Sequence, residues 1–166
     1  MSLQEAEVND LKTLYTNNLK KAFDMEIKIT RVLPAMVERS KDAELIDAFR
    51  VHLRQTEAHV VAVESLLLWH LGEAETDTCK VIGDLKVGAN DTIKNVTETA
   101  CDSALIGAAQ QVEHHEIAVY ESLRQCAERL GLEDDAVILE AIEADETHAD
   151  AVLTRISARV NHGVAA

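Results

Sequence analysis

The chain has 166 residues, a length that suits one hydrophobic core, so we expect a single domain over residues 1–166. Hydrophobic residues make up 47% of the sequence but aromatic residues only 3%. This composition favours packed helices, because sheets are rich in aromatic and β-branched side chains. The net charge of −14 argues against nucleic acid and anionic lipid as partners, since both require clustered Lys and Arg.

Cysteine usage and the N-terminal residues bear on the cellular compartment. The three cysteines, Cys79, Cys101 and Cys126, are odd in number and form no Cys-x-x-Cys pair, so they predict neither a disulfide framework nor a zinc ribbon. The first residues, MSLQEAEVNDLKTLY, are polar and acidic and do not resemble an export signal. We find no uncharged run of about 20 apolar residues, and we therefore expect a soluble, cytoplasmic protein without a membrane partner.

The first half of the chain carries apolar residues at spacings of three and four, which is the periodicity of a helix. One helix is predicted over about residues 5–39, with a kink near Pro34, because proline lacks the amide donor and crowds the preceding turn. A second is predicted over about residues 41–71, with Ser40 as its N-cap and Gly72 just after its end. Together they predict a helical hairpin.

The second half shows the same periodicity. A third helix is predicted from Cys101 to Gly131, and a fourth from the acidic run at 133–135 to about residue 160, because acidic residues suit the positive end of a helix dipole. Residues 73–99, EAETDTCKVIGDLKVGANDTIKNVTET, are too many for a hairpin turn and predict a long crossover with a short extra helix. The expected fold is all-α, a ferritin-like four-helix bundle built from two helical hairpins.

The two hairpins resemble each other in sequence. EIKITRVLPAMVER (26–39) aligns with EIAVYESLRQCAER (116–129) at an offset of 90 residues, and QTEAHVV (55–61) aligns with ETHADAV (146–152) at an offset of 91. This alignment pairs Glu26 with Glu116, Gln55 with Glu146, and His59 with Asp150. Each paired side chain is polar and falls near the middle of its helix.

The repeat predicts a metal site between the helices. Residues at i, i+3 and i+7 share a helix face, which groups His52, Gln55 and His59 on the second helix and Glu143, Glu146 and Asp150 on the fourth. Carboxylates buried at one height repel one another, and one or two metal ions relieve that repulsion. Oxygen-rich sites with imidazole suit iron or manganese better than zinc. The predicted ligands are Glu26, His59, Glu113, Glu116, Glu146 and Asp150.

The stretch EHHEIAVY (113–120) contributes two of these ligands. Glu113 lies one turn before Glu116 and faces the same way. His114 and His115 point about 100° and 200° away from Glu113, so we assign them to the rim of the site or to a dimer contact. Tyr120 either donates a hydrogen bond to Glu116 or packs in the core. Elsewhere in the chain, Trp69 and Phe49 are predicted core residues.

Three segments resemble the YciE/YciF family of ferritin-like bacterial proteins: AFDMEIKITRVLP (22–34), HLRQTEAHVVAVE (52–64) and LIGAAQQVEHHEIAVYESLRQCAERLG (105–131). The resemblance covers roughly residues 10–160. It implies a rubrerythrin-like four-helix bundle, a homodimer, a dimetal centre and a link to stress responses. The chain departs from the family pattern at Gln55, where relatives tend to carry Glu, and at Lys28, where they carry Gln. Because neutral Gln binds iron poorly, we expect the second hairpin to supply the stronger half of the site.

These observations leave more than one function open. The leading hypothesis is a cytoplasmic, dimeric bundle that binds one or two iron or manganese ions per protomer, with a role in stress and redox activity at the metal. The alternative is a non-catalytic structural or interaction dimer with a vestigial metal site. A ferritin-type storage cage is the weakest of the three. The sequence shows no phosphate-binding glycine loop and no nucleophile motif, and it does not decide whether the protein is an enzyme.

Overall fold

The structure is a computed structural model that describes residues 3–85 and 96–163. Its helices are α1 (Leu3–Arg39), α2 (Ala43–Leu71), α4 (Cys101–Leu130) and α5 (Glu133–Gly163), with a single 3₁₀ turn, η1 (Glu98–Ala100), before α4. Residues 80–85 are also helical. The described residues contain no strand, so the prediction of an all-α fold is confirmed.

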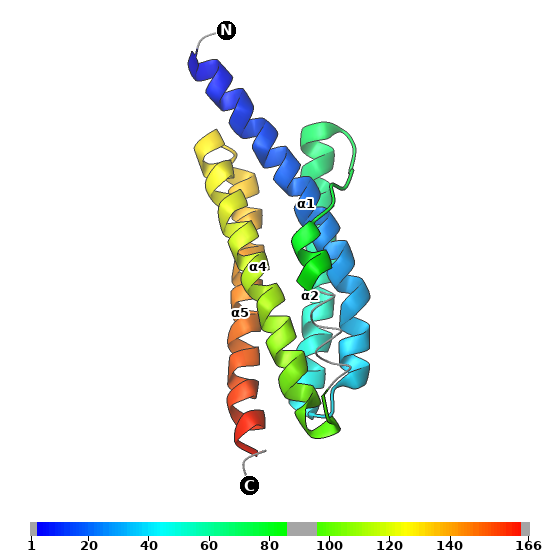
Figure 1. Cartoon of the computed structure of the whole chain (residues 1–166). Helices are drawn as coiled ribbons and strands as arrows, with labels where there is room; N and C mark the ends of the chain where they lie inside the picture. Colours follow the sequence, from blue (N-terminus) through cyan, green and yellow to red (C-terminus); the bar gives the residue numbers. More distant parts are fainter. Residues whose placement is uncertain (1–2, 86–95, 164–166) are drawn as a thin grey trace.

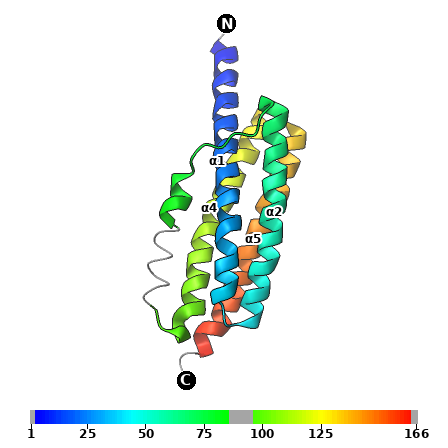
Figure 2. The ribbon, with the colours of Figure 1, turned by 90° about the vertical axis from the view of Figure 1, so that its right-hand side faces the viewer.

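The four long helices form a bundle of two antiparallel hairpins (Figures 1 and 2). α1 packs against α2, and α4 packs against α5; the hairpins meet where α1 contacts α4 and α2 contacts α5. The chain leaves α2 at one end of the bundle and enters α4 at the other, so the connection crosses the full length of the bundle. This is the ferritin-like arrangement that the long connection predicted.

A glycine ends α2 and another ends α4. Gly72 and Gly131 have φ angles of 75° and 72°, a left-handed conformation that glycine adopts without steric cost and that commonly ends a helix. α1 continues through Pro34 to Arg39. The predicted N-cap of α2 was wrong: Asp42, not Ser40, accepts hydrogen bonds from the amides of Glu44 and Leu45.

Ser40 cannot cap α2, because its hydroxyl donates back to the carbonyl oxygen of Met36 at 2.8 Å, within α1. A set of hydrogen bonds made by Asp42, Asp102 and Arg159, which we term the clamp, stabilises this end of the bundle. The carboxylate of Asp102 accepts the amide hydrogens of Lys41 and Asp42, both at 2.9 Å. Arg159 of α5 donates to both oxygens of Asp42 at 2.7 Å. The clamp therefore joins the α1–α2 turn to the start of α4 and the end of α5.

The crossover starts on the surface of α1. The amide of Asp77 donates to the carbonyl oxygen of Lys20, and the amide of Cys79 donates to Asp24 at 2.8 Å. Lys28 donates to the carbonyl oxygen of Cys79 at 3.1 Å, so its side chain also ties the crossover to α1. Helical residues 80–85 match the predicted short extra helix. Residues 86–95 of the predicted crossover lie outside the described residues.

Large apolar side chains fill the bundle, and Phe49 is buried as predicted. Trp69, by contrast, is 82% exposed, so its assignment to the core was wrong. The helix phase explains the error: Leu66, Leu67 and His70 face inward, which turns Trp69 toward the outside of α2.

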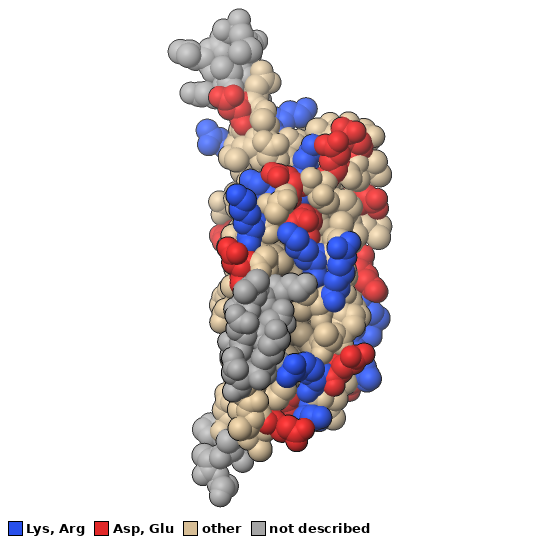
Figure 3. All heavy atoms as spheres, turned by 45° about the vertical axis from the view of Figure 1, so that its right-hand side comes forward, with Lys and Arg blue, Asp and Glu red and all other residues tan. Residues whose placement is uncertain are grey.

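Figure 3 shows Lys and Arg interspersed with Asp and Glu over one face of the bundle. On this face the basic side chains therefore form no continuous patch of the kind that nucleic acid requires. None of the described helices is long and apolar enough to cross a bilayer.

Candidate metal centre

Six ionisable side chains meet inside the bundle at mid-height, and each is no more than 5% exposed. They come from all four long helices. α1 provides one carboxylate and α2 provides two imidazoles, whereas α4 and α5 together provide three carboxylates. Burying charged groups is costly unless a counter-ion or hydrogen bonds compensate them. The six residues are Glu26, His52, His59, Glu113, Glu116 and Glu146.

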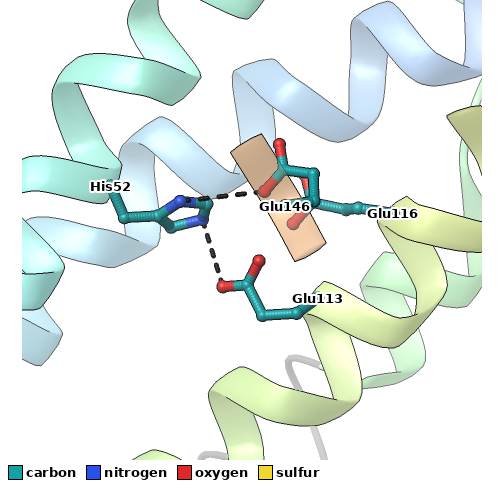
Figure 4. Close-up of side chains that lie close together, drawn as sticks. All are labelled: His52, Glu113, Glu116 and Glu146. Atoms are coloured by element: carbon teal, nitrogen blue, oxygen red, sulfur yellow. Dashed lines mark ion pairs between the residues drawn. The ribbon is translucent and has the colours of Figure 1, made fainter. Parts of the chain in front are cut away.

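Four of these residues form what we term the first buried group: His52, Glu113, Glu116 and Glu146. One ligand atom from each lies within 4.8 Å of the others. His52 is placed between two carboxylates (Figure 4), with Nε2 3.2 Å from Oε1 of Glu113 and Nδ1 3.7 Å from Oε2 of Glu146. The side chains converge from α2, α4 and α5.

The second buried group consists of Glu26, His59 and Glu146, whose ligand atoms also lie within 4.8 Å of one another. Nδ1 of His59 is 2.9 Å from Oε1 of Glu146 and 3.8 Å from Oε1 of Glu26. The hydroxyl of Tyr120 donates a short hydrogen bond to Glu26. Glu146 belongs to both groups, so its carboxylate lies between them.

The polar atoms of these residues are largely without hydrogen bonds. Among the described residues, every buried side-chain nitrogen or oxygen that lacks a hydrogen-bond partner belongs to one of the six. Both oxygens of Glu116 and of Glu146, and both ring nitrogens of His52, are in this state. Buried polar atoms without partners are rare in folded proteins, and an ion is one of the standard explanations.

Burial and mutual repulsion disfavour negative charge on the carboxyl groups. Burial, with the repulsion of Glu146, raises the pKa of Glu26 to about 8. The same two causes raise the pKa of Glu113 and of Glu116 well above the ordinary value. Without a cation, Glu26 therefore holds a proton at neutral pH, and Glu113 and Glu116 resist ionisation.

The two imidazoles respond in opposite directions. Burial lowers the pKa of His52, with partial compensation from the charge of Glu146. Burial also opposes charge on His59, but the neighbouring Glu146, at 2.9 Å, and Glu26 outweigh it and raise its pKa to about 9. His52 is thus neutral and able to donate a lone pair to a cation. His59 would have to release a proton before doing so.

The donor set fits a metal ion. Four carboxylates and two imidazoles supply oxygen and nitrogen atoms and no sulfur, a combination that suits iron or manganese. A cation of charge two or three would neutralise the carboxylates and give the unpartnered atoms a common ligand. The two groups, with Glu146 between them, can accommodate one or two such ions.

Five of the six predicted ligands fall in these groups, and Asp150 does not. Its side chain is 20% exposed and lies 3.5 Å from Nε2 of the exposed His114. It also accepts a hydrogen bond from Gln110 at 3.1 Å. Glu143 lies away from both groups and pairs with Arg124 at 2.8 Å. Gln55 is half-buried and lines a cavity together with His52 and Glu113.

His52 was not among the predicted ligands. It was placed on the same helix face as His59, and at the offset of 91 its counterpart was Glu143, which pairs with Arg124 instead. At an offset of 90 its counterpart is Ile142, an apolar core residue. The available signal was the helix face itself, since His52 lies seven residues, or two turns, before His59.

Burial supports one offset of 90 residues throughout the repeat, rather than a change to 91. With this offset, buried Phe49, Thr56 and Val63 correspond to buried Leu139, Glu146 and Leu153. Thr56 is then the counterpart of Glu146, and Ala149 is the counterpart of His59. The first hairpin therefore has Thr56 where the second has the carboxylate of Glu146. The second hairpin has Ala149 where the first has the imidazole of His59.

The remaining residues of the EHHEIAVY stretch lie near the site without joining it. His114 is 68% exposed, and its side chain lies at the rim. His115 is half-buried, with Nε2 3.7 Å from the sulfur of Cys79. Tyr120 is fully buried, as the second of its two predicted roles requires, and its hydroxyl binds Glu26 and not Glu116.

Comparison with known proteins relates nearly the whole chain to one family. The family model described as "Domain of unknown function (DUF892)" matches residues 10–165. Protein YciF of Escherichia coli strain K12 is 28% identical over 154 residues, which cover 89% of this chain and 90% of YciF.

Solved structures agree with this relationship. The crystal structure of YciF, described as an E. coli stress protein, matches with a TM-score of 0.86 and 27% identity over 92% of this chain and 97% of YciF. YcfI from Rhodopseudomonas palustris matches with a TM-score of 0.84 and 28% identity, covering 87% of this chain and 92% of YcfI. A Xanthomonas campestris protein shares the fold, with a TM-score of 0.76 at 21% identity over 92% and 95% of the two chains.

Proposed function

This chain belongs to the DUF892 family, and we propose that it binds one or two iron or manganese ions per protomer inside its four-helix bundle. The observation that carries the proposal is the concentration of unpartnered buried polar atoms in the two buried groups. A folded protein without a cation would have to bury four carboxyl groups with few hydrogen bonds, at a cost that metal binding offsets.

Each residue has a distinct part in this proposal. In the first buried group, neutral His52 would ligate together with Glu113, Glu116 and Glu146, and in the second, His59 would ligate with Glu26 and Glu146. Tyr120 fixes Glu26 through its hydrogen bond and thereby holds that carboxylate toward His59. Bound iron or manganese would supply one-electron redox chemistry toward oxygen or peroxide.

The cellular role and the assembly are further parts of the proposal. YciF is described as a stress protein, which supports a stress-related role for this relative in the cytoplasm. We propose a homodimer, because α2 carries the outward-facing apolar residues Val61, Leu68 and Trp69 on one face. Size-exclusion chromatography separates a dimer from a monomer and from a ferritin-type cage.

A second function is favoured by specific residues. YcfI is provisionally described as a structural protein, and in this chain Thr56 and Ala149 stand where a symmetric site would have ligands. A structural or interaction dimer with a vestigial site would contain metal well below one ion per protomer. Removal of the buried carboxylates would then leave metal content and stability unchanged.

Elemental analysis of the purified protein tests the two functions. We expect at least one iron or manganese ion per protomer in the wild type and a loss of most of it in a Glu116→Ala, Glu146→Ala variant. The matched control is Glu121→Ala, Glu140→Ala, which removes two exposed glutamates from the same two helices. If the Glu116, Glu146 variant folds and holds as much metal as the control, the proposed function is wrong.

A further inference from the structure

A cavity of about 100 Å³ reaches the first buried group from one side of the bundle. It lies between the C-terminal half of α1, the first half of α4 and helical residues 80–85. At its inner end it is lined by His52 and Glu113, the two side chains joined by a dashed line in Figure 4. The cavity therefore connects directly with two of the proposed ligands.

Apart from this inner end, the walls are almost entirely apolar. The residues that define them include Ile29, Leu33, Ile82, Leu105, Ala109 and Val112. Such walls offer a water molecule few hydrogen-bond partners, and cavities of this kind stay dry or take up apolar molecules. The walls thus select an apolar occupant.

The volume of the cavity limits the size of the molecule that can occupy it. One water molecule needs only about 10–15 Å³ of comparable volume, whereas an engineered apolar cavity of about 150 Å³ binds benzene or xenon. A volume of about 100 Å³ exceeds what a diatomic gas needs and falls somewhat short of the benzene-binding example. It suits an organic molecule with a few carbon atoms.

The opposite side of the same two residues is different. A cavity of about 160 Å³ between α2 and α5 also reaches His52 and Glu113, but Gln55 and His148 line it. Apolar residues, among them Phe49, Val152 and Leu153, also line this second cavity, so its walls are mixed in polarity, in contrast to those of the first cavity.

The polar atoms at the inner end present almost no surface to an occupant. Both ring nitrogens of His52 and Oε2 of Glu113 are buried and have no hydrogen-bond partner. An occupant would therefore lie mainly against the apolar wall residues, with its end next to His52 and Glu113.

We propose that the cavity between α1 and α4 is a binding site for a small, largely apolar organic molecule, no larger than about benzene, held against His52 and Glu113. This inference deepens the proposed function. It rests on the proposed function in one respect, namely that the bound molecule is the substrate of the metal centre. Binding itself depends only on the cavity.

Xenon-pressurised crystals test the binding site directly. We expect a xenon atom in the wild-type cavity between Leu105 and Ala109, and we expect benzene to bind the protein in solution. Ala109→Met places a longer side chain in the cavity and should abolish the xenon site and weaken benzene binding at least tenfold. Ala118→Met, on the same helix but outside this cavity, is the control and should bind both as the wild type does.

The same samples separate this proposal from the metal proposal. Xenon binding that persists in the Glu116→Ala, Glu146→Ala variant supports the cavity, whatever that variant reveals about metal. Ala109→Met should retain wild-type metal content, because Ala109 is not among the ligands. Absence of xenon from wild-type crystals would overturn the inference, even if the protein proved to contain its full complement of metal. This wild-type measurement also stands if Ala109→Met fails to fold.

Discussion

Oε1 of Glu146 lies 2.9 Å from Nδ1 of His59, while its Oε2 lies 3.7 Å from Nδ1 of His52. The two oxygens of one carboxylate thus face the two imidazoles of α2, and each imidazole belongs to a different buried group. Glu26, in contrast, belongs to the second group alone. The two glutamates should therefore differ in how much metal their loss removes.

Glu146→Gln should remove metal from both groups, whereas Glu26→Gln should remove it from the second group only. Elemental analysis should find close to none in the first variant and at least half of the wild-type content in the second. Glu140→Gln, on the exposed side of α5, controls for the change in charge. Equal losses from Glu146→Gln and Glu26→Gln would contradict the shared position of Glu146.

The stability of the metal-free protein should fall as the pH rises from about 6.5 to 8. The pKa of Glu26 is about 8 in the folded state, so the folded protein keeps a proton that the unfolded chain has released. The pKa of His59 is about 9, so its stabilising charge is complete below the unfolded pKa and is lost above it. Both groups therefore lower the free energy of unfolding as the pH rises, each by up to about 1.4 kcal/mol per pH unit.

Urea unfolding of the metal-free protein at a series of pH values measures this slope. Glu26→Gln should reduce it, because one of the proton-retaining groups is gone. With metal added, the slope should reverse, because the cation displaces protons and binds better as the pH rises. A metal-free protein that grows more stable between pH 6.5 and 8 would be inconsistent with these pKa values.

Much of the fold follows from local sequence signals. The caps at Gly72 and Gly131 and the acidic run at 133–135 mark where helices end and begin, because these residue types act within a single turn. Ser40 failed as a cap, since its hydroxyl finds an acceptor in the preceding helix before α2 begins. Which of two nearby polar residues caps a helix depends on the geometry of the turn.

The repeat in the sequence predicted part of the candidate site. Glu26 and Glu116 align without ambiguity. Over residues 55–61 the offset of 91 gives three identical residues and the offset of 90 gives none, and only burial identifies Thr56 as the counterpart of Glu146. An error of one residue rotates a helix position by about 100°. That rotation is why Asp150, and not Ala149, was paired with His59.

The clamp at the α1–α2 turn should contribute measurably to stability. Asp42→Ala removes the N-cap of α2 and the partner of Arg159, and we expect a loss of about 1–2 kcal/mol in unfolding free energy. Ser40→Ala, two residues away, should cost less, because Ser40 does not cap α2. A larger loss for Ser40→Ala, measured by urea unfolding, would restore Ser40 as the cap.

Acid should weaken the same clamp. Hydrogen bonds from Arg159 lower the pKa of Asp42 to about 2. A carboxyl group with a lowered pKa stabilises the folded state above its unfolded pKa, near 4, and loses that contribution as the pH falls toward 2. The difference in stability between the wild type and Asp42→Ala should therefore shrink over this range. A difference that stays constant down to pH 2 would show that the charge of Asp42 plays no part.

Thr56→Glu should place a carboxylate at the position that Glu146 occupies in the other hairpin. Thr56 is fully buried on α2, between His52 and His59. Without metal, the new carboxylate adds to a cluster that already resists ionisation, and we expect a loss of about 2–4 kcal/mol in unfolding free energy. With iron or manganese, the added ligand should bind the cation, so that metal raises the melting temperature of the variant by more than it raises that of the wild type.

Thr56→Gln is the matched control for this gain, because it adds a side chain of nearly the same size without the charge. It should be destabilised in the metal-free state and should gain no more from metal than the wild type does. Thermal unfolding of the three proteins with and without metal distinguishes the cases. If Thr56→Glu gains no more from metal than Thr56→Gln, then position 56 does not face the metal, and the correspondence with Glu146 is one of packing alone.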